Sequence, residues 1–189
     1  MFCRRISFVV NRYFIFGGMD ASLIFDEFKA NAVLRMGENI PRIEKCLVLL
    51  SEDEVWHKPN TNLNSVGNLL LHLSGNITQY IVSSLGGEPD KRIRDEEFGA
   101  KGGYTKAELF DKISSTINTA CAVINNASPE ELMRVRSVQG FNYSGMGNVI
   151  HVAEHLSYHV GQIAFLTKVL KDKDLGFYAG QDLNVKNVL

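Results

Sequence analysis

The amphipathic segment of residues 146–171 constrains the fold more than any other feature of the chain. On a helix that turns by about 100° per residue, four of its apolar side chains fall within about 40° of the direction of Leu156. They recur three or four positions apart, at Val149, Val152, Val160 and Ile163. This spacing predicts a long helix with one buried face, whose C-terminal lysines suit the helix dipole.

Three further segments carry helical periodicity. Residues 21–50 form the first, in which Pro41 predicts a kink or a break near Asn39. Residues 65–85 form the second, with Asn64 as a candidate N-cap and two glycines as a stop. The third opens at residue 105 with a capping-box pattern and ends before residue 128.

These four helices predict an all-α fold, an antiparallel four-helix bundle with one long crossover connection. The crossover is the charged, glycine-rich segment 86–103, and residues 51–62 are expected to be a polar connection. Residues 135–140 alternate weakly between apolar and polar side chains, but no partner strand is evident.

Composition and charge narrow the classes of function. The 189 residues carry a formal net charge of −1, which argues against a protein that coats nucleic acid. The three cysteines are widely spaced, so the sequence indicates neither a disulfide framework nor a zinc-thiolate site. We therefore expect a cytoplasmic protein with no nucleic-acid partner and no membrane association.

The first 18 residues differ from the rest of the chain. They contain two arginines followed by an apolar run that Asn11 and Arg12 interrupt, and the run is too short to span a bilayer. We interpret residues 1–18 as an N-terminal appendage outside the folded domain and residues 19–189 as a single domain.

The histidines are the candidate metal ligands. His151, His155 and His159 lie four residues apart on the predicted last helix. From the buried stripe, His159 lies at about 60°, His155 at about 100° and His151 at about 140°, so the last is expected to face solvent or a rim. On the second helix, His72 lies at about 100° from the stripe marked by Leu73.

If these two helices are neighbours, His72, His155 and His159 converge. Three ligands with an open fourth position are typical of catalytic metal sites, and imidazole suits zinc, nickel, copper or iron. The alternative is a set of ordinary helix-edge histidines with no metal. His57, in the polar connection after Trp56, is expected to have no such role.

Three stretches, in this order and spacing, resemble the DinB-like superfamily. They are "NSVGNLLLHLSGNITQYI" (64–81), "GGEPDKRIRDEEF" (86–98) and "HVAEHLSYHVGQIAFLTK" (151–168). The resemblance implies a DinB-like helical bundle with a divalent metal on His72, His155 and His159, and with His151 beside the site. Many relatives have an arginine after the last histidine, where this chain has Val160. Homodimers are common in this superfamily, so a homodimer is expected here.

The superfamily includes transferases and isomerases that use a low-molecular-weight thiol such as bacillithiol, mycothiol or glutathione. The leading hypothesis is therefore a transferase that binds a zinc or nickel ion, such a thiol and a small-molecule substrate, because a metal lowers the pKa of a bound thiol. The alternatives are a metal-dependent hydrolase and a non-catalytic metal-binding stress-response protein.

Other candidate residues are less well defined by the sequence, and no catalytic residue is assigned. Asn76 is placed to hydrogen-bond a ligand or to pack as a buried polar residue. Arg92 and Arg94 are placed to bind an anionic group or to form local ion pairs. Glu154 is expected to be solvated and Tyr158 to lie on the surface, and no carboxylate is identified as a general base.

Overall fold

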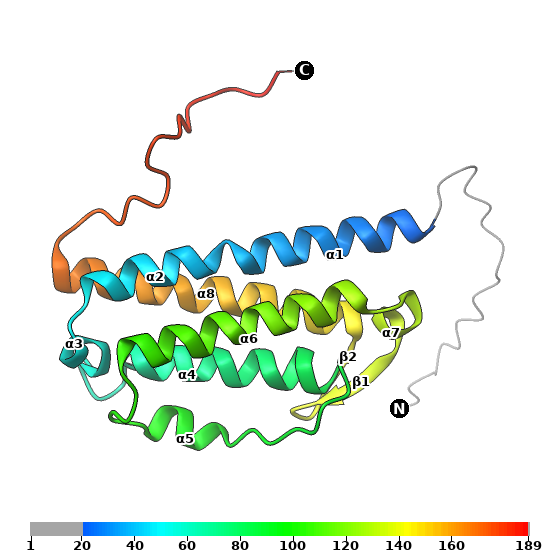
Figure 1. Ribbon diagram of the computed structural model, residues 1–189, viewed down its shortest axis with the longest axis horizontal. Helices are drawn as coiled ribbons and strands as arrows, with labels where there is room; N and C mark the ends of the chain where they lie inside the picture. Colours follow the sequence, from blue (N-terminus) through cyan, green and yellow to red (C-terminus); the bar gives the residue numbers. More distant parts are fainter. Residues whose placement is uncertain (1–20, 189) are drawn as a thin grey trace, which may run out of the picture.

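The computed structural model describes residues 21–188, and long helices make up most of them (Figure 1). The N-terminal appendage proposed for residues 1–18 lies outside the described residues. The long helical elements are α1 (Ala21–Gly37), α2 (Asn39–Leu49), α4 (Val66–Ile77) with the π-helical turn η1 (Thr78–Ser83), α6 (Lys106–Asn126) and α8 (Gly145–Lys171). The all-α prediction is confirmed, apart from one small hairpin.

Helices α1 and α2 form one rod with a break between them, as the sequence predicted. The break falls at Glu38, and Pro41 lies in the first turn of α2, where its missing N–H costs no helical hydrogen bond. The side chain of Asn39 donates a hydrogen bond to the carbonyl of Arg35 at 2.8 Å, which ties the two helices together across the break.

Helix α4 begins one residue later than predicted. Ser65, not Asn64, is the N-cap, because its side chain accepts a hydrogen bond from Asn68 N while the Asn68 side chain returns to Ser65 N. Beyond Ile77 the helix widens into η1, a π-helical turn of the kind that often lies at functional sites.

Short elements occupy the segments that were expected to be irregular. The predicted polar connection 51–62 contains α3 (Glu52–Trp56), and the crossover 86–103 contains α5 (Arg94–Gly99). After α6, α7 (Pro129–Met133) leads into the hairpin of β1 (Val135–Val138) and β2 (Phe141–Ser144), which pair antiparallel with Val138 opposite Phe141. The partner strand that the sequence did not reveal is therefore β2.

Helix α4 packs against several other helices. Helix α4 contacts α6 and α8, α6 contacts α1 and α2, and α8 contacts α1 and α2 (Figure 1). The apolar stripe predicted for α8 is buried, at Val149, Val152, Leu156, Val160 and Ile163. Because α5 covers a further face of α4, nearly every residue of α4 is buried, including His72.

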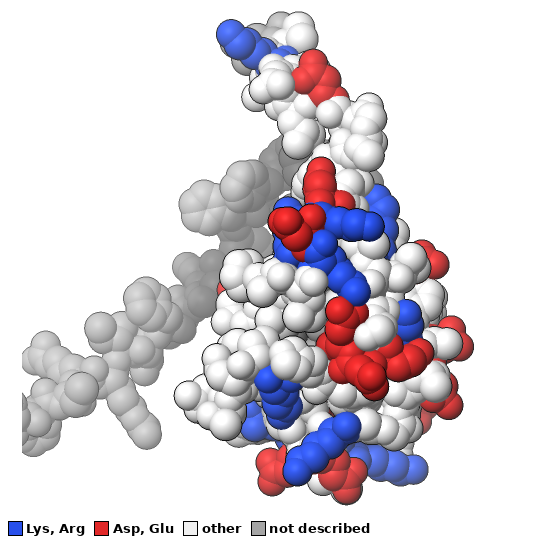
Figure 2. Space-filling view, turned by 90° about the vertical axis from the view of Figure 1, so that its left-hand side faces the viewer, with Lys and Arg blue, Asp and Glu red and all other residues white. Residues whose placement is uncertain are grey.

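The described residues contain neither a disulfide bond nor a candidate membrane-spanning helix. Cys46 and Cys121 are free, and burial raises the pKa of each thiol. Within residues 21–188, no helix combines the length and the apolar character needed to cross a lipid bilayer. On the face shown in Figure 2, acidic and basic side chains lie close to one another among uncharged residues.

Candidate metal centre

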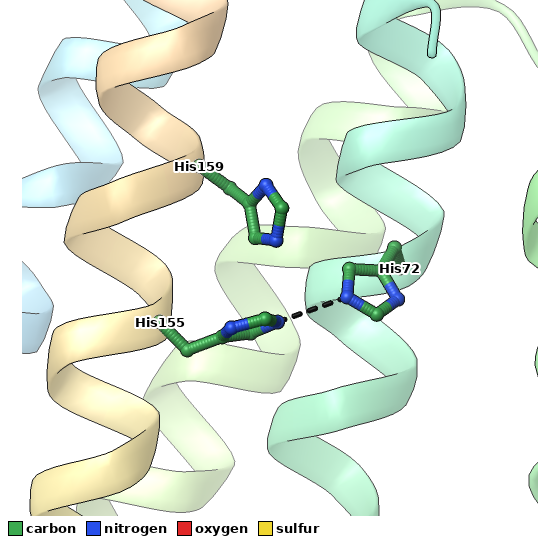
Figure 3. Close-up of side chains that lie close together, drawn as sticks. All are labelled: His72, His155 and His159. Atoms are coloured by element: carbon green, nitrogen blue, oxygen red, sulfur yellow. Dashed lines mark hydrogen bonds between the residues drawn. The ribbon is translucent and has the colours of Figure 1, made fainter. Parts of the chain in front are cut away.

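Three histidines from two helices meet in the interface between α4 and α8 (Figure 3). One ring nitrogen from each of His72, His155 and His159 lies within 4.8 Å of the others. The ring of His72 lies 5.0 Å from that of His155 and 5.1 Å from that of His159, centroid to centroid. The structure therefore brings together the three residues that the helix-edge argument selected.

Behind His72 lies a buried carboxylate that sequence reasoning missed. Glu97, from α5, accepts a hydrogen bond from Nδ1 of His72 at 3.0 Å, and its side chain is only 10% exposed. A carboxylate at Nδ1 fixes the tautomer of an imidazole and increases the basicity of its other nitrogen. His72 thereby presents a lone pair at Nε2, toward the two histidines of α8.

Arg92 holds the Glu97 carboxylate in place. Its Nε donates to Oε1 of Glu97 at 2.7 Å and its Nη2 to Oε2 at 2.8 Å, a bidentate ion pair. Burial alone would raise the pKa of Glu97, but the hydrogen bonds from Arg92 and His72 reverse this effect and lower it. Glu97 is therefore an anion at neutral pH.

Gly75 leaves the space that this carboxylate occupies. Gly75 lies on α4 one turn beyond His72, and a Cβ built on it would lie 1.9 Å from Oε1 of Glu97. No side chain larger than hydrogen fits at this position without displacing Glu97.

The α8 histidines are also oriented, and they are uncharged. Nδ1 of His159 lies 2.6 Å from the side-chain oxygen of Gln162 and donates to it, which leaves Nε2 as the acceptor. Burial, followed by the neighbouring imidazoles, lowers the pKa of His155 to about 3. Burial also lowers the pKa of His159, although its hydrogen bond to Gln162 opposes the shift. Neutral imidazoles are the form that binds metals.

The donor set fits a divalent cation. Nε2 of His72 and Nε2 of His155 lie 2.9 Å apart, and because His72 presents a lone pair there, His155 donates the proton in this contact. When that proton moves to Nδ1 of His155, the two Nε2 lone pairs face one another, an arrangement that a cation stabilises. The separation approaches the roughly 3.3 Å between ligands of a tetrahedral ion with bonds of about 2.0–2.1 Å.

His151 lies beside the cluster, as the resemblance implied, and at a rim of the kind that the helix geometry predicted. It is half-buried, and its ring stacks on that of Tyr80 at 4.4 Å and on that of His155 at 5.4 Å. Burial lowers its pKa, and Glu154 partly opposes this effect. The amide nitrogen of Asn76 lies 3.5 Å from Nε2 of His151, while the buried Asn76 Oδ1 has no partner among the described residues.

The remaining candidates lie outside the cluster. Of the two alternatives stated for Arg92, the structure shows the local ion pair, because its side chain is 4% exposed and is paired with Glu97. Arg94 instead lies over the ring of Phe98, 4.7 Å from its centroid. Glu154 and Tyr158 are exposed, as expected. His57 is exposed too and is not among the clustered histidines.

Comparison with known proteins identifies the family. The family model described as "Protein of unknown function (DUF1572)" matches residues 26–179. The chain belongs to the DUF1572 family. DUF1572 is a DinB-like family, so the resemblance stated from the sequence is confirmed. No curated protein matches the chain in sequence.

Two solved structures share the fold of this DUF1572 chain. A DinB-like protein from Bacillus subtilis, YjoA, is 17% identical, with a TM-score of 0.60 over 78% of this chain and 97% of that one. A conserved protein from Enterococcus faecalis is 15% identical, with a TM-score of 0.58 over 82% of this chain and all of the other. At these identities the likeness establishes the fold alone.

Proposed function

We propose that this DUF1572 protein is a metal-dependent transferase that uses a low-molecular-weight thiol, with zinc or nickel held by His72, His155 and His159. One observation carries the proposal: three imidazoles converge, and a buried Glu97 carboxylate orients the first of them. A cation in this position lowers the pKa of a coordinated thiol and makes it a nucleophile at neutral pH.

The residues around the cluster have separate tasks in this proposal. Glu97 fixes the tautomer of His72, and Gln162 does the same for His159. Because three protein ligands leave a fourth position for an exogenous group, the site suits catalysis better than a structural role. The acceptor oxygen of Asn76, which lacks a partner among the described residues, suits a donor on that group.

The proposal also covers the helix arrangement, the domain bounds, the oligomeric state and the location of the protein. The rods α1–α2 and α4–η1, together with α6 and α8, would form a four-helix bundle, with the segment containing α5 as its crossover. We further propose that residues 19–189 are one domain and that the protein acts as a cytoplasmic homodimer on a small-molecule substrate, without nucleic-acid or membrane partners.

Elemental analysis of the purified protein tests the metal. Wild type is expected to hold about one zinc or nickel ion per chain, and His72→Ala should hold far less. His57→Ala is the matched control, since His57 is exposed and lies outside the cluster. Equal metal content in wild type and His72→Ala would disprove the metal site.

Turnover separates the classes of function. Thiol-dependent consumption of electrophiles by the metal-loaded protein supports the transferase. Cleavage of esters or amides without any effect of thiols favours a metal-dependent hydrolase, in which water is the nucleophile. Full metal occupancy without turnover, but with a melting temperature that falls in His155→Ala, favours a non-catalytic stress-response protein.

A further inference from the structure

A cavity of about 400 Å³ opens beside the histidine cluster, within the size range of small-molecule sites. Its walls come from the connection between α3 and α4, from α4 and from the C-terminal half of α8. The lining residues are Asn62, Leu63, Asn64, Leu69, Tyr158, Gly161, Gln162, Phe165 and Leu166. We call this space the Gly161 cavity.

The Gly161 cavity adjoins the cluster through two of its walls. Gln162 lines it and also accepts the hydrogen bond from Nδ1 of His159. Tyr158 lines it too, and its ring lies 5.0 Å from the ring of His159. On α4, Leu69 precedes His72 by one helical turn. A ligand in the cavity therefore lies against the same helix faces that carry the metal ligands.

The lining has a distinct chemistry, because none of its side chains is charged. The other described cavities all include acidic residues, and most include basic ones as well. The polar side-chain groups here are the amides of Asn62, Asn64 and Gln162 and the hydroxyl of Tyr158, and large apolar side chains surround them. Phe165 and Tyr158 remain 67% and 62% exposed, although both are large hydrophobic residues. A neutral, largely apolar molecule matches this surface.

Gly161 keeps the cavity open. Glycine is the least favourable residue inside a helix apart from proline, yet Gly161 lies in the middle of α8. A Cβ built on Gly161 meets no atom within 4 Å, so close helix packing does not require glycine here. A larger side chain would instead extend into the cavity that Gly161 lines.

We propose that the Gly161 cavity binds the apolar part of an uncharged organic substrate whose reactive end lies at the histidine cluster. This inference rests on the proposed function and adds the class of substrate to it. The apolar part is stabilised by burial against Leu69, Phe165 and Leu166, while the amides of the lining bind a neutral polar group.

Fluorescence titration with the neutral probe N-phenylnaphthylamine tests the cavity without any metal. The full-length wild type should bind the probe, and Gly161→Leu should bind it at least tenfold more weakly because leucine fills the space. Gly37→Leu is the control. A Cβ on Gly37 also meets nothing within 4 Å, and Gly37 does not line the Gly161 cavity. Equal affinities of Gly161→Leu and wild type would overturn the proposal.

The variant Gly161→Ala distinguishes a loss of cavity space from a loss of folding. Alanine stabilises a helix relative to glycine, so this variant should keep its circular dichroism and its metal content while probe affinity falls to an intermediate value. Probe binding that falls only in step with lost helicity would overturn the proposal.

The binding of alkanethiols to the cobalt-loaded protein tests whether a ligand at the histidine cluster extends into the Gly161 cavity. The thiolate-to-cobalt absorption band reports binding, and wild-type affinity should rise about fourfold per methylene from ethanethiol to butanethiol. In Gly161→Leu the affinity should not depend on chain length. An affinity independent of chain length in wild type would overturn the inference, whereas failure of cobalt to bind would overturn the proposed function and leave the probe titration valid.

Sedimentation distinguishes a small molecule from a second copy of the chain. If the exposed Tyr158 and Phe165 are covered by a partner subunit, wild type will dimerise, Gly161→Leu will be monomeric and neither will bind the probe. That combination would overturn the proposal. The expected result is one association state for both proteins, with probe binding by wild type.

Discussion

Glu97 accepts a hydrogen bond from Nδ1 of His72 at 3.0 Å, although 25 residues separate the two in the sequence. The contact joins α5, within the segment 86–103, to the buried face of α4. Since Arg92 neutralises the carboxylate, Glu97 orients His72 without leaving an unpaired buried charge. The segment 86–103, which contains α5, therefore contributes to the surroundings of the histidine cluster and is not only a connection.

Replacing Glu97 with glutamine should weaken metal binding by about 10–100-fold, because outer-sphere partners of this kind contribute that much to metal affinity. An amide is a poorer acceptor than a carboxylate, so His72 loses both tautomer control and basicity. Competition with a chromophoric chelator measures the affinity. Glu96→Gln is the matched control, because Glu96 is exposed next to it in α5, and an equal loss in both variants would contradict the assigned role.

Gly75→Ala should disturb the contact between His72 and Glu97 by displacing the Glu97 carboxylate. A Cβ at this position lies 1.9 Å from Oε1 of Glu97, so the carboxylate must move away from His72. We expect a loss of about 1–3 kcal/mol in the free energy of unfolding, as for overpacked cores, together with weaker metal binding. Urea denaturation measures the first effect. Gly37→Ala should show neither, and a fully stable, metal-replete Gly75→Ala protein would refute the prediction.

The sequence predicted the convergence of the histidines where the helical period determines the geometry. His155 and His159 border the buried stripe of α8 because positions four apart drift by only about 40°, and the structure confirms this placement. The same arithmetic predicts solvent or a rim for His151, and the structure shows the rim, where the residue is half-buried against Tyr80. The period fixes the direction of a side chain on its own helix but not which neighbouring residues cover it.

The sequence mainly failed to predict the short elements, because they have no repeating pattern of apolar residues. Helix α5 has no repeat that would reveal a buried face, so Glu97 could not be distinguished from the acidic residues beside it. Two signals were nevertheless present in the sequence. The pattern Ser51 to Glu54 is a capping box and marks α3, and Gln139–Gly140 supplies the two positive-φ positions of the hairpin turn.

The metal-free protein should lose stability as the pH falls from 6.5 toward 3. Burial and neighbouring imidazoles lower the pKa of His155 from 6.5 to about 3, so in this window the unfolded chain binds a proton that the folded chain does not. The contribution of His155 is complete above pH 6.5 and declines below it, by at most about 1.4 kcal/mol per pH unit for one proton. Urea denaturation in the presence of a chelator, across this range, measures the slope.

The His155→Asn protein should show a shallower pH dependence than wild type, and His57→Asn should retain the wild-type slope. His151 and His159 act in the same direction, because burial lowers the pKa of each. The slope in His155→Asn is therefore reduced but not abolished. A slope in this variant equal to that of wild type would show that His155 titrates normally in the folded chain.

An ion pair at the other end of α8 gives a second, separate pH effect. Lys171 bonds to both carboxylate oxygens of Glu54 in α3, at 2.8 Å and 2.7 Å. This contact, followed by the bond from Ser51, lowers the pKa of Glu54 from 4.5 to about 2. Since the folded pKa is depressed, the stabilisation is present above pH 4.5 and declines as the pH falls toward 2.

Glu54→Gln should therefore lower the melting temperature at neutral pH, and its difference from wild type should shrink as acid protonates the wild-type carboxylate. The effect is small because the pair is solvent-accessible, and added salt should reduce it further. Calorimetry across the acidic range measures the difference. Glu44→Gln, on the exposed face of α2, provides the baseline for loss of one surface charge. A difference between Glu54→Gln and wild type that persists unchanged below pH 2 would mean that Glu54 acts through the α3 capping box and not through its charge.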